Sequence, residues 1–207
     1  MRIGNGTKIF ANPRNVLIDE TRPWLIHIGS NVQITSGVKI LTHGYDWSVI
    51  KGTSGEILGS SGKVTIGNNC FIGMNTVILK GTTIGDNVII GAQSLVRGKI
   101  PSNTVAAGTP CKVIMSLEEY KQKRIEAQVQ EAKELVKEFF QVYKKSPSKK
   151  ELTEFFWLFS ERDQPLPLAF ENKMKLLNNY DFSMKVLKNT KPLFSSYDEF
   201  IEYCLNR

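Results

Sequence analysis

Residues 66–96 read IGNNCFIGMNTVILKGTTIGDNVIIGAQSLV, and the spacing within this stretch decides the fold. An aliphatic side chain returns at every sixth position, and a small or branched side chain stands four positions after each of them. The aliphatic residues are Ile66, Ile72, Ile78, Ile84, Ile90 and Val96, and the residues four places on are Cys70, Thr76, Thr82, Val88, Ser94 and Ile100. A helix with 3.6 residues per turn cannot keep a period of six on one face. The pattern predicts short strands joined by tight turns, with each aliphatic residue stacked on its equivalent in the next coil.

Glycine and asparagine occupy the positions between the expected strands. Glycine directly follows four of the six aliphatic residues, and Asn68-Asn69 and Asp86-Asn87 suit turns that need a positive φ. Earlier copies of the spacing lie at Ile28, Ile34 and Ile40, with less regular ones at Ile3 and Ile9. We therefore expect one repetitive domain over residues 1–115.

The composition of the chain changes near residue 115. All sixteen glycines lie between Gly4 and Gly108, whereas nine of the eleven phenylalanines lie in residues 116–207. Residues 1–115 hold eleven Lys and Arg against five Asp and Glu, so they carry almost all of the formal charge of +7. A positive field on a weakly charged domain fits a small anionic ligand. Nucleic acid is not expected as a partner, because the sequence has no basic helix and no alternation of basic and aromatic residues.

Residues 116–207 are predicted to form an α-helical extension. Helix starts are indicated at Ser116-Leu117-Glu118-Glu119, at Ser148-Lys149-Lys150-Glu151 and at Ser196. Apolar residues at three- and four-residue steps then predict an amphipathic helix of about seven turns over residues 117–143. Phe155, Phe156 and Phe159 follow the second start at helical spacing, and we interpret them as core rather than as a cofactor site.

The stretch from Ile66 to Val96 resembles the hexapeptide repeat of the left-handed parallel β-helix acyltransferases. With the ending AAGTPCKVI at residues 106–114, it is similar to the galactoside, maltose and polysaccharide O-acetyltransferase branch of that family. The resemblance implies a mainly β fold, a left-handed parallel β-helix over residues 1–115 in which three hexapeptides close one coil. The helices of residues 116–207 would follow it, and their role is left open. It also implies a homotrimer with active sites between subunits, acetyl-CoA as the acyl donor and no metal.

The period of six is interrupted between Ile40 and Ile66, so residues 42–65 are predicted to form an extruded loop, and long loops are often functional. His43 stands at its start. The resembling enzymes place their one essential histidine where such a loop leaves the coil, which makes His43 the expected catalytic residue. An imidazole, with an ordinary pKa of about 6.5, can remove a proton from a hydroxyl as the oxygen attacks a thioester. Asp46 or a backbone carbonyl could orient the ring, and the sequence leaves this open.

The resemblance also assigns binding residues. The family's coenzyme A contacts fall on Met74, Ala92, Arg97, Gly98 and Lys112 when they are carried over position by position. Arg97 and Lys112 would be the counter-charges for the pyrophosphate and the 3′-phosphate. The stretches Phe10-Ala11-Asn12 and Ile18-Asp19-Glu20 resemble an acceptor-binding segment, which assigns Asn12 and Glu20 to the sugar.

These observations favour an acetyl-CoA-dependent O-acetyltransferase that acts on a hydroxyl of a sugar or a surface-polysaccharide precursor. The transfer would be direct, with His43 as general base. An acyltransferase for an antibiotic or an amine is the alternative enzyme, because its donor site would look the same. A non-catalytic β-helix scaffold is the alternative from another class. The acceptor, the hydroxyl that is acylated and the acyl chain preference stay open.

Several functions are disfavoured by what the sequence lacks. The γ-type carbonic anhydrases share the β-helix, but their zinc needs three histidines and this chain has two. The three cysteines stand at no metal-like spacing, so we expect reduced thiols in a cytoplasmic protein. No apolar run reaches the roughly 18 residues of a membrane span, and the first residues do not read as a secretory signal.

Overall fold

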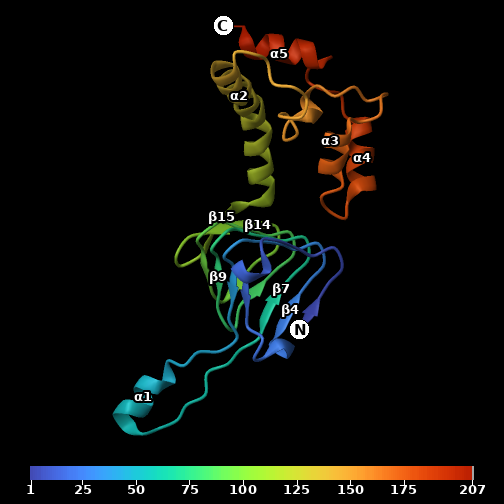
Figure 1. The fold of residues 1–207 in the computed structure, drawn as a ribbon. Helices are drawn as coiled ribbons and strands as arrows, with labels where there is room; N and C mark the ends of the chain where they lie inside the picture. The colour runs from blue at the N-terminus through green and yellow to red at the C-terminus, as the bar shows by residue number, and fades with distance from the viewer. Residues whose placement is uncertain (207) are drawn as a thin grey trace. The chain divides into compact units, whose positions relative to one another are not determined.

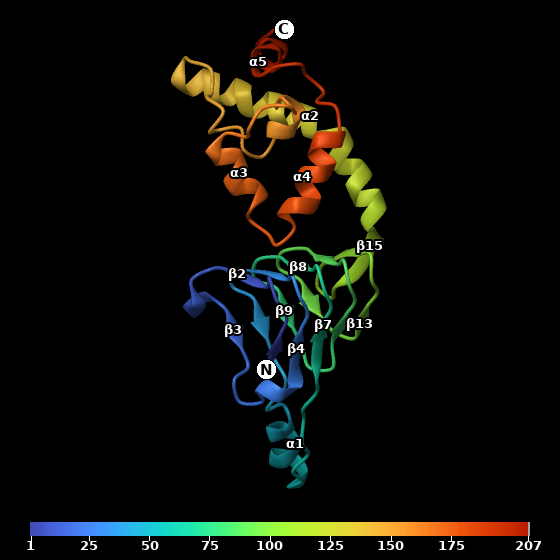
Figure 2. The ribbon, with the colours of Figure 1, turned by 90° about the vertical axis from the view of Figure 1, so that its right-hand side faces the viewer.

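The computed structural model describes residues 1–206, and the chain forms two compact units, Met1–Lys121 and Gln122–Arg207. The first unit contains three β-sheets and the second contains helices and turns (Figures 1 and 2).

Fifteen short strands make up the three sheets. The first sheet contains β1 (Arg2–Ile3), β4 (Ile26–Ile28), β7 (Val64–Ile66), β10 (Thr83–Ile84) and β13 (Lys99–Ile100). The second contains β2 (Lys8–Phe10), β5 (Gln33–Thr35), β8 (Phe71–Ile72), β11 (Ile89–Ile90), β14 (Thr104–Ala107) and β15 (Lys112–Ser116). The third contains β3 (Leu17–Ile18), β6 (Lys39–Ile40), β9 (Val77–Ile78) and β12 (Leu95–Val96). Two 3₁₀ turns, η1 (Pro13–Asn15) and η2 (Pro23–Leu25), lie between early strands.

The chain visits the three sheets in turn, so each strand from β1 to β11 pairs in parallel with the strand three places on. Ile66 pairs with Ile84, as the period of six requires. Polar contacts between neighbouring regular coils, such as Asn68 to Asp86, join residues 18 apart in sequence. The predicted stacked parallel coil is therefore confirmed. β15 alone runs antiparallel, against β14, and ends the coil.

The interior of the coil is an apolar column. All six aliphatic residues from Ile66 to Val96 are at most 2% exposed, and the residues four places after each of them are buried as well. Burying one such side chain is worth about 1.5–3 kcal/mol, so the repeat supplies its own core. The coil corners explain the asparagines, because Asn69 and Asn87 have φ angles of 53° and 56°. Gly67 is required by close approach, since a Cβ there would lie 2.6 Å from the backbone of Gly85.

Between β6 and β7 the chain leaves the coil and carries α1 (Trp47–Ser54) (Figures 1 and 2). This helix was not predicted: no residue of α1 is buried, so its sequence carries no pattern of core-facing side chains. Gly55 ends it in a left-handed conformation with φ 80°, and its N–H donates to the carbonyl of Lys51. A glycine at that position is a common helix stop.

The second unit is built on α2 (Leu117–Tyr143), which begins in the first unit and matches the predicted seven-turn helix. The predicted capping box is present: Glu119 N–H donates to Ser116 Oγ at 3.1 Å, and Ser116 N–H donates to the Glu119 carboxylate at 2.7 Å. The remaining elements are η3 (Phe156–Leu158), α3 (Leu168–Met174), α4 (Tyr180–Asn189) and α5 (Tyr197–Leu205). Ser196 caps α5 as predicted, accepting from Glu199 N–H at 3.1 Å.

The helix expected after Ser148 does not form. The capping contact from Ser148 N–H to Glu151 is made, at 2.6 Å, but turns and the short η3 follow it. Leu158 and Phe159 are nevertheless at most 3% exposed, so tertiary packing rather than a helical stripe buries this segment. The interpretation of the aromatic residues as core is confirmed for Phe156 and Phe159, whose rings stack on those of other buried phenylalanines. No helix within residues 1–206 has both the length and the apolar character that crossing a membrane would need.

Candidate active site

His43 lies just beyond β6, at the point where the chain leaves the coil, and its side chain is 15% exposed. The residues just before β7, where the chain returns to the coil, hold this corner in place. Gly62 N–H donates to the carbonyl of Thr42 at 2.8 Å, and Ser61 Oγ donates to the same carbonyl at 3.2 Å. The ring of Tyr45 stands edge-on to the imidazole at 5.2 Å. The histidine is therefore on a fixed corner of the coil, although the excursion beyond it is exposed.

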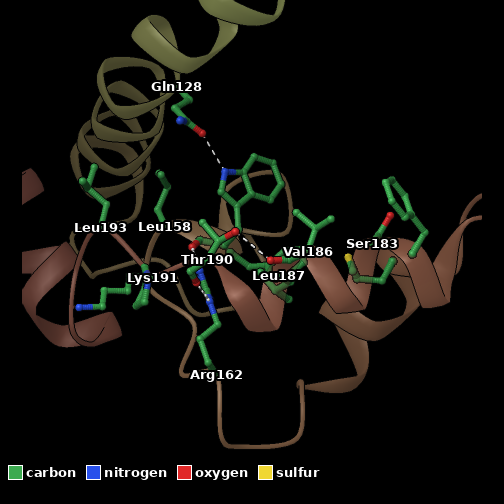
Figure 3. A pocket seen from close by; sticks show the side chains of 14 residues that line it. Gln128, Leu158, Arg162, Ser183, Val186, Leu187, Thr190, Lys191 and Leu193 are labelled. Carbon is green, nitrogen blue, oxygen red and sulfur yellow. Dashed lines mark hydrogen bonds between the residues drawn. The ribbon is translucent and has the colours of Figure 1, made fainter. Parts of the chain in front are cut away.

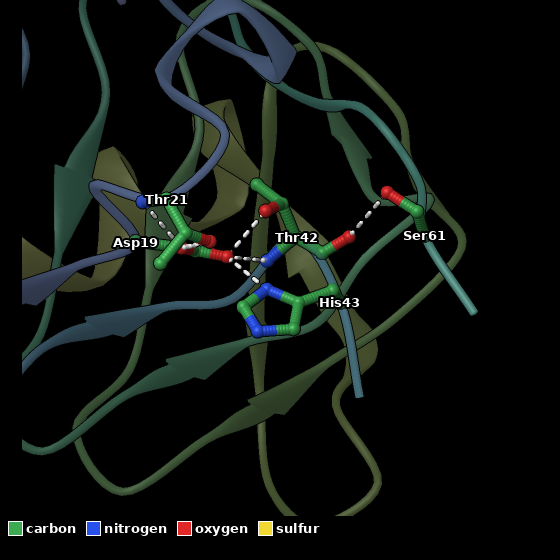
Figure 4. Close-up of polar contacts among 5 residues, drawn as sticks. All are labelled: Asp19, Thr21, Thr42, His43 and Ser61. Carbon is green, nitrogen blue, oxygen red and sulfur yellow. Dashed lines mark hydrogen bonds and ion pairs between the residues drawn. The ribbon is translucent and has the colours of Figure 1, made fainter. Parts of the chain in front are cut away.

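Asp19 is the partner of this histidine (Figure 4). Its Oδ2 lies 2.6 Å from His43 Nδ1, and its side chain is 4% exposed. Oδ2 also accepts from Thr42 N–H at 3.1 Å and from the Thr42 hydroxyl. Oδ1 accepts from Thr21 N–H at 3.0 Å and from Thr21 Oγ1 at 2.6 Å. Both carboxylate oxygens are thus occupied by donors from three residues.

The donors around Asp19 decide its charge. Burial raises the pKa of this carboxyl, but the hydrogen bonds from Thr21, Thr42 and His43 together outweigh burial and hold the pKa well below its ordinary value. An ionised carboxylate can only accept hydrogen bonds, so Nδ1 of His43 must carry the proton. The lone pair of the neutral imidazole then lies on Nε2, to which no residue within 1–206 makes a hydrogen bond. That nitrogen can accept a proton from a ligand.

The partner of His43 was missed by sequence analysis, which considered Asp46 or a backbone carbonyl. Asp46 is exposed and precedes α1, where its side chain makes no capping hydrogen bond. Asp19 instead follows β3, whose Ile18 pairs with Ile40 of β6, so the register of these strands brings it beside Thr42 and His43. The signal was present in the sequence, because Asp19 directly follows Ile18 of the repeat and directly precedes Glu20, the residue assigned to the acceptor.

The residues assigned to the donor lie at two different corners of the coil. Arg97 and Gly98 follow β12 at the corner between the third and first sheets, the corner that also carries His43 two coils earlier. Met74 and Ala92 lie at the corner between the second and third sheets, and Met74 is 53% exposed. The carbonyl of Met74 accepts from the backbone next to Ala92, at Gln93 N–H, at 2.7 Å.

Lys112 begins β15 beside Ala107, next to the corner that holds Met74 and Ala92. Arg97 and Lys112 are both exposed, and neither forms an ion pair with any carboxylate in the described part of the chain. Both cations are therefore free to meet phosphate oxygens. Within one chain, however, the strand order does not bring the two corners together.

The two residues assigned to the acceptor are also on different corners. Asn12 is exposed between β2 and β3, and its Oδ1 accepts from Arg14 N–H at 3.0 Å, a local turn contact. Glu20 is exposed directly after Asp19, at the corner of His43. Of the pair, Glu20 is the one that shares a corner with the imidazole.

The thiols give no sign of a nucleophile. Cys70 is 1% exposed inside the coil, and burial raises its pKa to about 11. Burial also raises the pKa of Cys111, which is half-buried near the end of the coil. A thiolate is the reactive form of cysteine, and burial disfavours it. Among residues 1–206, no three His, Cys, Asp or Glu side chains gather in a way that could hold a metal ion.

Comparisons with known proteins place this geometry in a family. Residues 63–98 match the family described as bacterial transferase hexapeptide (six repeats). The chain is 40% identical over 112 residues to the galactoside O-acetyltransferase of Escherichia coli, which covers 54% of this chain and 53% of that protein. It is 40% identical over 126 residues to the protein CapG of Staphylococcus aureus, covering 61% of this chain and 72% of CapG.

Among solved structures, a hexapeptide-repeat acetyltransferase of Vibrio cholerae in complex with acetyl coenzyme A aligns with a TM-score of 0.47 at 30% identity. The match covers 56% of this chain and 60% of that one. The chain spans about half the length of several curated relatives that it matches, including the galactoside enzyme. The repeat, the parallel coil and the match over most of CapG lead to one conclusion. The chain belongs to the hexapeptide-repeat acyltransferase family.

Proposed function

We propose that the protein is an O-acetyltransferase that moves an acetyl group from acetyl-CoA to a hydroxyl of a sugar or a surface-polysaccharide precursor. The observation that carries the proposal is the contact of 2.6 Å between His43 Nδ1 and the buried carboxylate of Asp19. It supplies an oriented imidazole with Nε2 available to accept a proton, which is what general-base catalysis needs. The relatives named for O-acetyl transfer support the choice of donor and of reaction.

The chemical steps follow from the position of the proton. Nε2 of His43 takes the proton of the acceptor hydroxyl as its oxygen attacks the thioester carbonyl carbon. The C–S bond then breaks, and the sulfur of coenzyme A leaves with the proton from Nε2. Asp19 keeps its negative charge throughout and stabilises the imidazolium formed in between. No covalent acetyl-enzyme is needed, because the thioester is already activated.

The two groups of donor residues support an active site formed between copies of the chain. We propose a homotrimer of left-handed coils in which Met74, Ala92 and Lys112 of one copy face the corner of Arg97 and His43 in its neighbour. Arg97 and Lys112 would then hold the phosphates of acetyl-CoA, and Asn12 and Glu20 the acceptor. All of these residues lie within Met1–Lys121, the unit that contains the coil.

Because its thiols are unpaired, we place the protein in the cytoplasm.

A first experiment separates an enzyme from a scaffold. Saturating acetyl-CoA should raise the melting temperature, because a ligand at 100 times its Kd adds about 2.7 kcal/mol of stability. Release of free coenzyme A thiol should then be followed with a panel of hexoses, amino sugars, nucleotide sugars and oligosaccharides, and with amines and aminoglycosides. Turnover with a sugar hydroxyl is expected. An unchanged melting temperature would refute the enzyme hypothesis. Turnover with amines alone would favour an acyltransferase for an antibiotic or an amine.

A second experiment tests the assembly. Sedimentation equilibrium should give three times the chain mass of 23.3 kDa. His43→Ala chains, which should be inactive, are mixed with Lys112→Ala chains, whose KM for acetyl-CoA should be raised. At acetyl-CoA well below the wild-type KM, the mixture should be more active than either variant alone if one site uses both residues from different copies. A fully active monomer would refute the shared site.

A further inference from the structure

The second unit contains a pocket that the proposed reaction does not use. Its volume is about 670 Å³, within the range of about 300–1,000 Å³ that is typical of ligand pockets. It is lined by residues of α2, η3, α3 and α4, by Arg162 and by the segment that follows α4, all within Gln122–Arg207 (Figure 3).

The walls of this pocket are largely apolar and open to solvent. Phe182 and Val186 lie four residues apart on one face of α4, and they are 73% and 50% exposed. Leu193, after α4, is 63% exposed, and Trp157 of η3 is 36% exposed. Large apolar side chains gathered around one hollow usually mark a binding surface.

The pocket also holds positive charge without a carboxylate. Arg162 and Lys191 are among its lining residues, and no Asp or Glu lines it. Arg162 Nε donates to the carbonyl of Thr190 at 2.7 Å, and its two terminal nitrogens donate to the carbonyls of Ser160 and Trp157. A guanidinium has five N–H groups, so these contacts fix its position and leave two N–H groups and the whole charge available. Lys191 is exposed and makes no ion pair within residues 1–206.

Several other polar groups of the pocket are already paired. Trp157 Nε1 donates to Gln128 Oε1 at 2.7 Å, as Figure 3 shows. Thr190 Oγ1 donates to the carbonyl of Val186 at 2.8 Å, and the carbonyls of Thr190 and Trp157 accept from Arg162. A peptide main chain or a sugar would find few partners here, whereas a hydrocarbon chain needs none.

We propose that this pocket binds a single-chain lipid phosphate. The hydrocarbon chain lies along Trp157, Phe182 and Val186, and the phosphate meets Arg162 and Lys191. A guanidinium with two further N–H groups and an ammonium from the lining of the same pocket match the several oxygens of a phosphate. The apolar walls account for the chain, and the unbalanced cations account for the anionic head. The site is independent of acetyl transfer, because none of its residues belongs to the coil.

The test uses dodecyl phosphate below its micelle concentration, titrated into the full chain by calorimetry without acetyl-CoA. Dodecanol and inorganic phosphate are the probes that lack one half of the ligand. We expect saturable binding of one dodecyl phosphate per chain, at least tenfold tighter than either half-ligand. Val186→Asp, which puts a carboxylate into the pocket at an exposed position, should weaken binding at least tenfold, and Lys191→Ala should weaken it about fivefold.

Val142→Asp is the matched control, because Val142 is 69% exposed on α2 and does not line the pocket. It should leave binding unchanged. Equal affinity for dodecanol, or unchanged binding by Val186→Asp, would overturn the proposal. So would binding to phosphatidylglycerol vesicles without binding of monomeric dodecyl phosphate, which would assign the surface to a membrane. Loss of self-association by Val186→Asp, without any lipid binding, would assign it to a second copy of the chain.

Discussion

Replacing Asp19 with Asn tests the proposed chemistry most directly, because it changes charge and hydrogen-bond direction with almost no change in shape. The amide keeps one oxygen and replaces the other with an NH₂ group. If NH₂ takes the place of Oδ2, it donates to His43 Nδ1 and the proton moves to Nε2, where a base is needed. If it takes the place of Oδ1, the ring keeps its tautomer and only the charge of Asp19 is lost.

The two orientations bracket the expected effect. Loss of a charged hydrogen-bond partner is worth about 1.5–3 kcal/mol, which corresponds to about a 10- to 150-fold loss of kcat. The wrong tautomer costs about 10⁴-fold in the serine protease triad, whose aspartate has the same role. Asp19→Asn should therefore lower kcat by about 10- to 10⁴-fold. Either orientation also faces NH₂ towards the backbone N–H of Thr21 or Thr42, which should destabilise the fold by about 1–3 kcal/mol.

The assay is coenzyme A thiol release with the best acceptor from the panel, at a temperature well below the melting point of the variant. An unchanged KM for acetyl-CoA shows that the donor site is intact. Asp46→Asn is the matched control, since Asp46 is an exposed carboxylate three residues from His43, and it should keep kcat within about twofold. If Asp19→Asn turns over like the wild type while His43→Ala is inactive, the orienting role of Asp19 is refuted.

Four further predictions follow from the same structure. His43→Ala should lower kcat by about 10²–10⁴-fold without loss of acetyl-CoA binding, and wild-type turnover would move the base elsewhere. Arg97→Ala and Lys112→Ala should each raise the KM for acetyl-CoA about tenfold, or ~1.4 kcal/mol of binding, with kcat nearly unchanged. Because hydrogen bonds lower its pKa in the folded state, Asp19 stabilises the fold at pH values above the ordinary carboxyl pKa of 3.8, and this stabilisation is lost as the pH falls. The melting temperature should therefore drop below about pH 4, and Asp19→Asn should flatten this decline. Equal declines in both proteins would argue against the role of Asp19. Cys70, with its pKa raised to about 11, should react with a thiol reagent only on unfolding, and fast labelling of the native protein at this position would contradict its burial.

The regular coils could be predicted from sequence because their contacts repeat. A period of six fixes which side chains point inward, and Ile66, Ile84 and their equivalents are buried accordingly. The contact between Asp19 and His43 joins residues 24 apart, in a part of the chain where the 3₁₀ turns η1 and η2 add residues between strands. Ile18 pairs with Ile40 at a separation of 22 residues instead of 18, so counting in coils of 18 does not place Asp19 beside His43.

The helical unit could be predicted only where local signals were strong. α2 and α5 begin at serines that cap them, and both were expected. α3 and α4 have 7 and 10 residues and no side-chain cap. Helices this short depend on packing against neighbours, and that packing is not written in their own sequence. The pocket beside α4 has the same origin, so no pattern in the sequence announced it.

The excursion that begins at His43 also has a consequence for the order of folding. Neighbouring coils after it are joined by contacts between residues 18 apart, as from Asn68 to Asp86, whereas the contact that bridges it, from Ser30 to Asn68, joins residues 38 apart. Closing the longer loop costs about 0.6 kcal/mol more in chain entropy, since the cost grows with the logarithm of loop length. The coils from β7 onward can therefore zip up on one another first, as repeat proteins do. The joint that closes later pairs β6, the strand that precedes His43, with β9. The coil that carries the histidine is therefore docked only after the regular coils that support it exist.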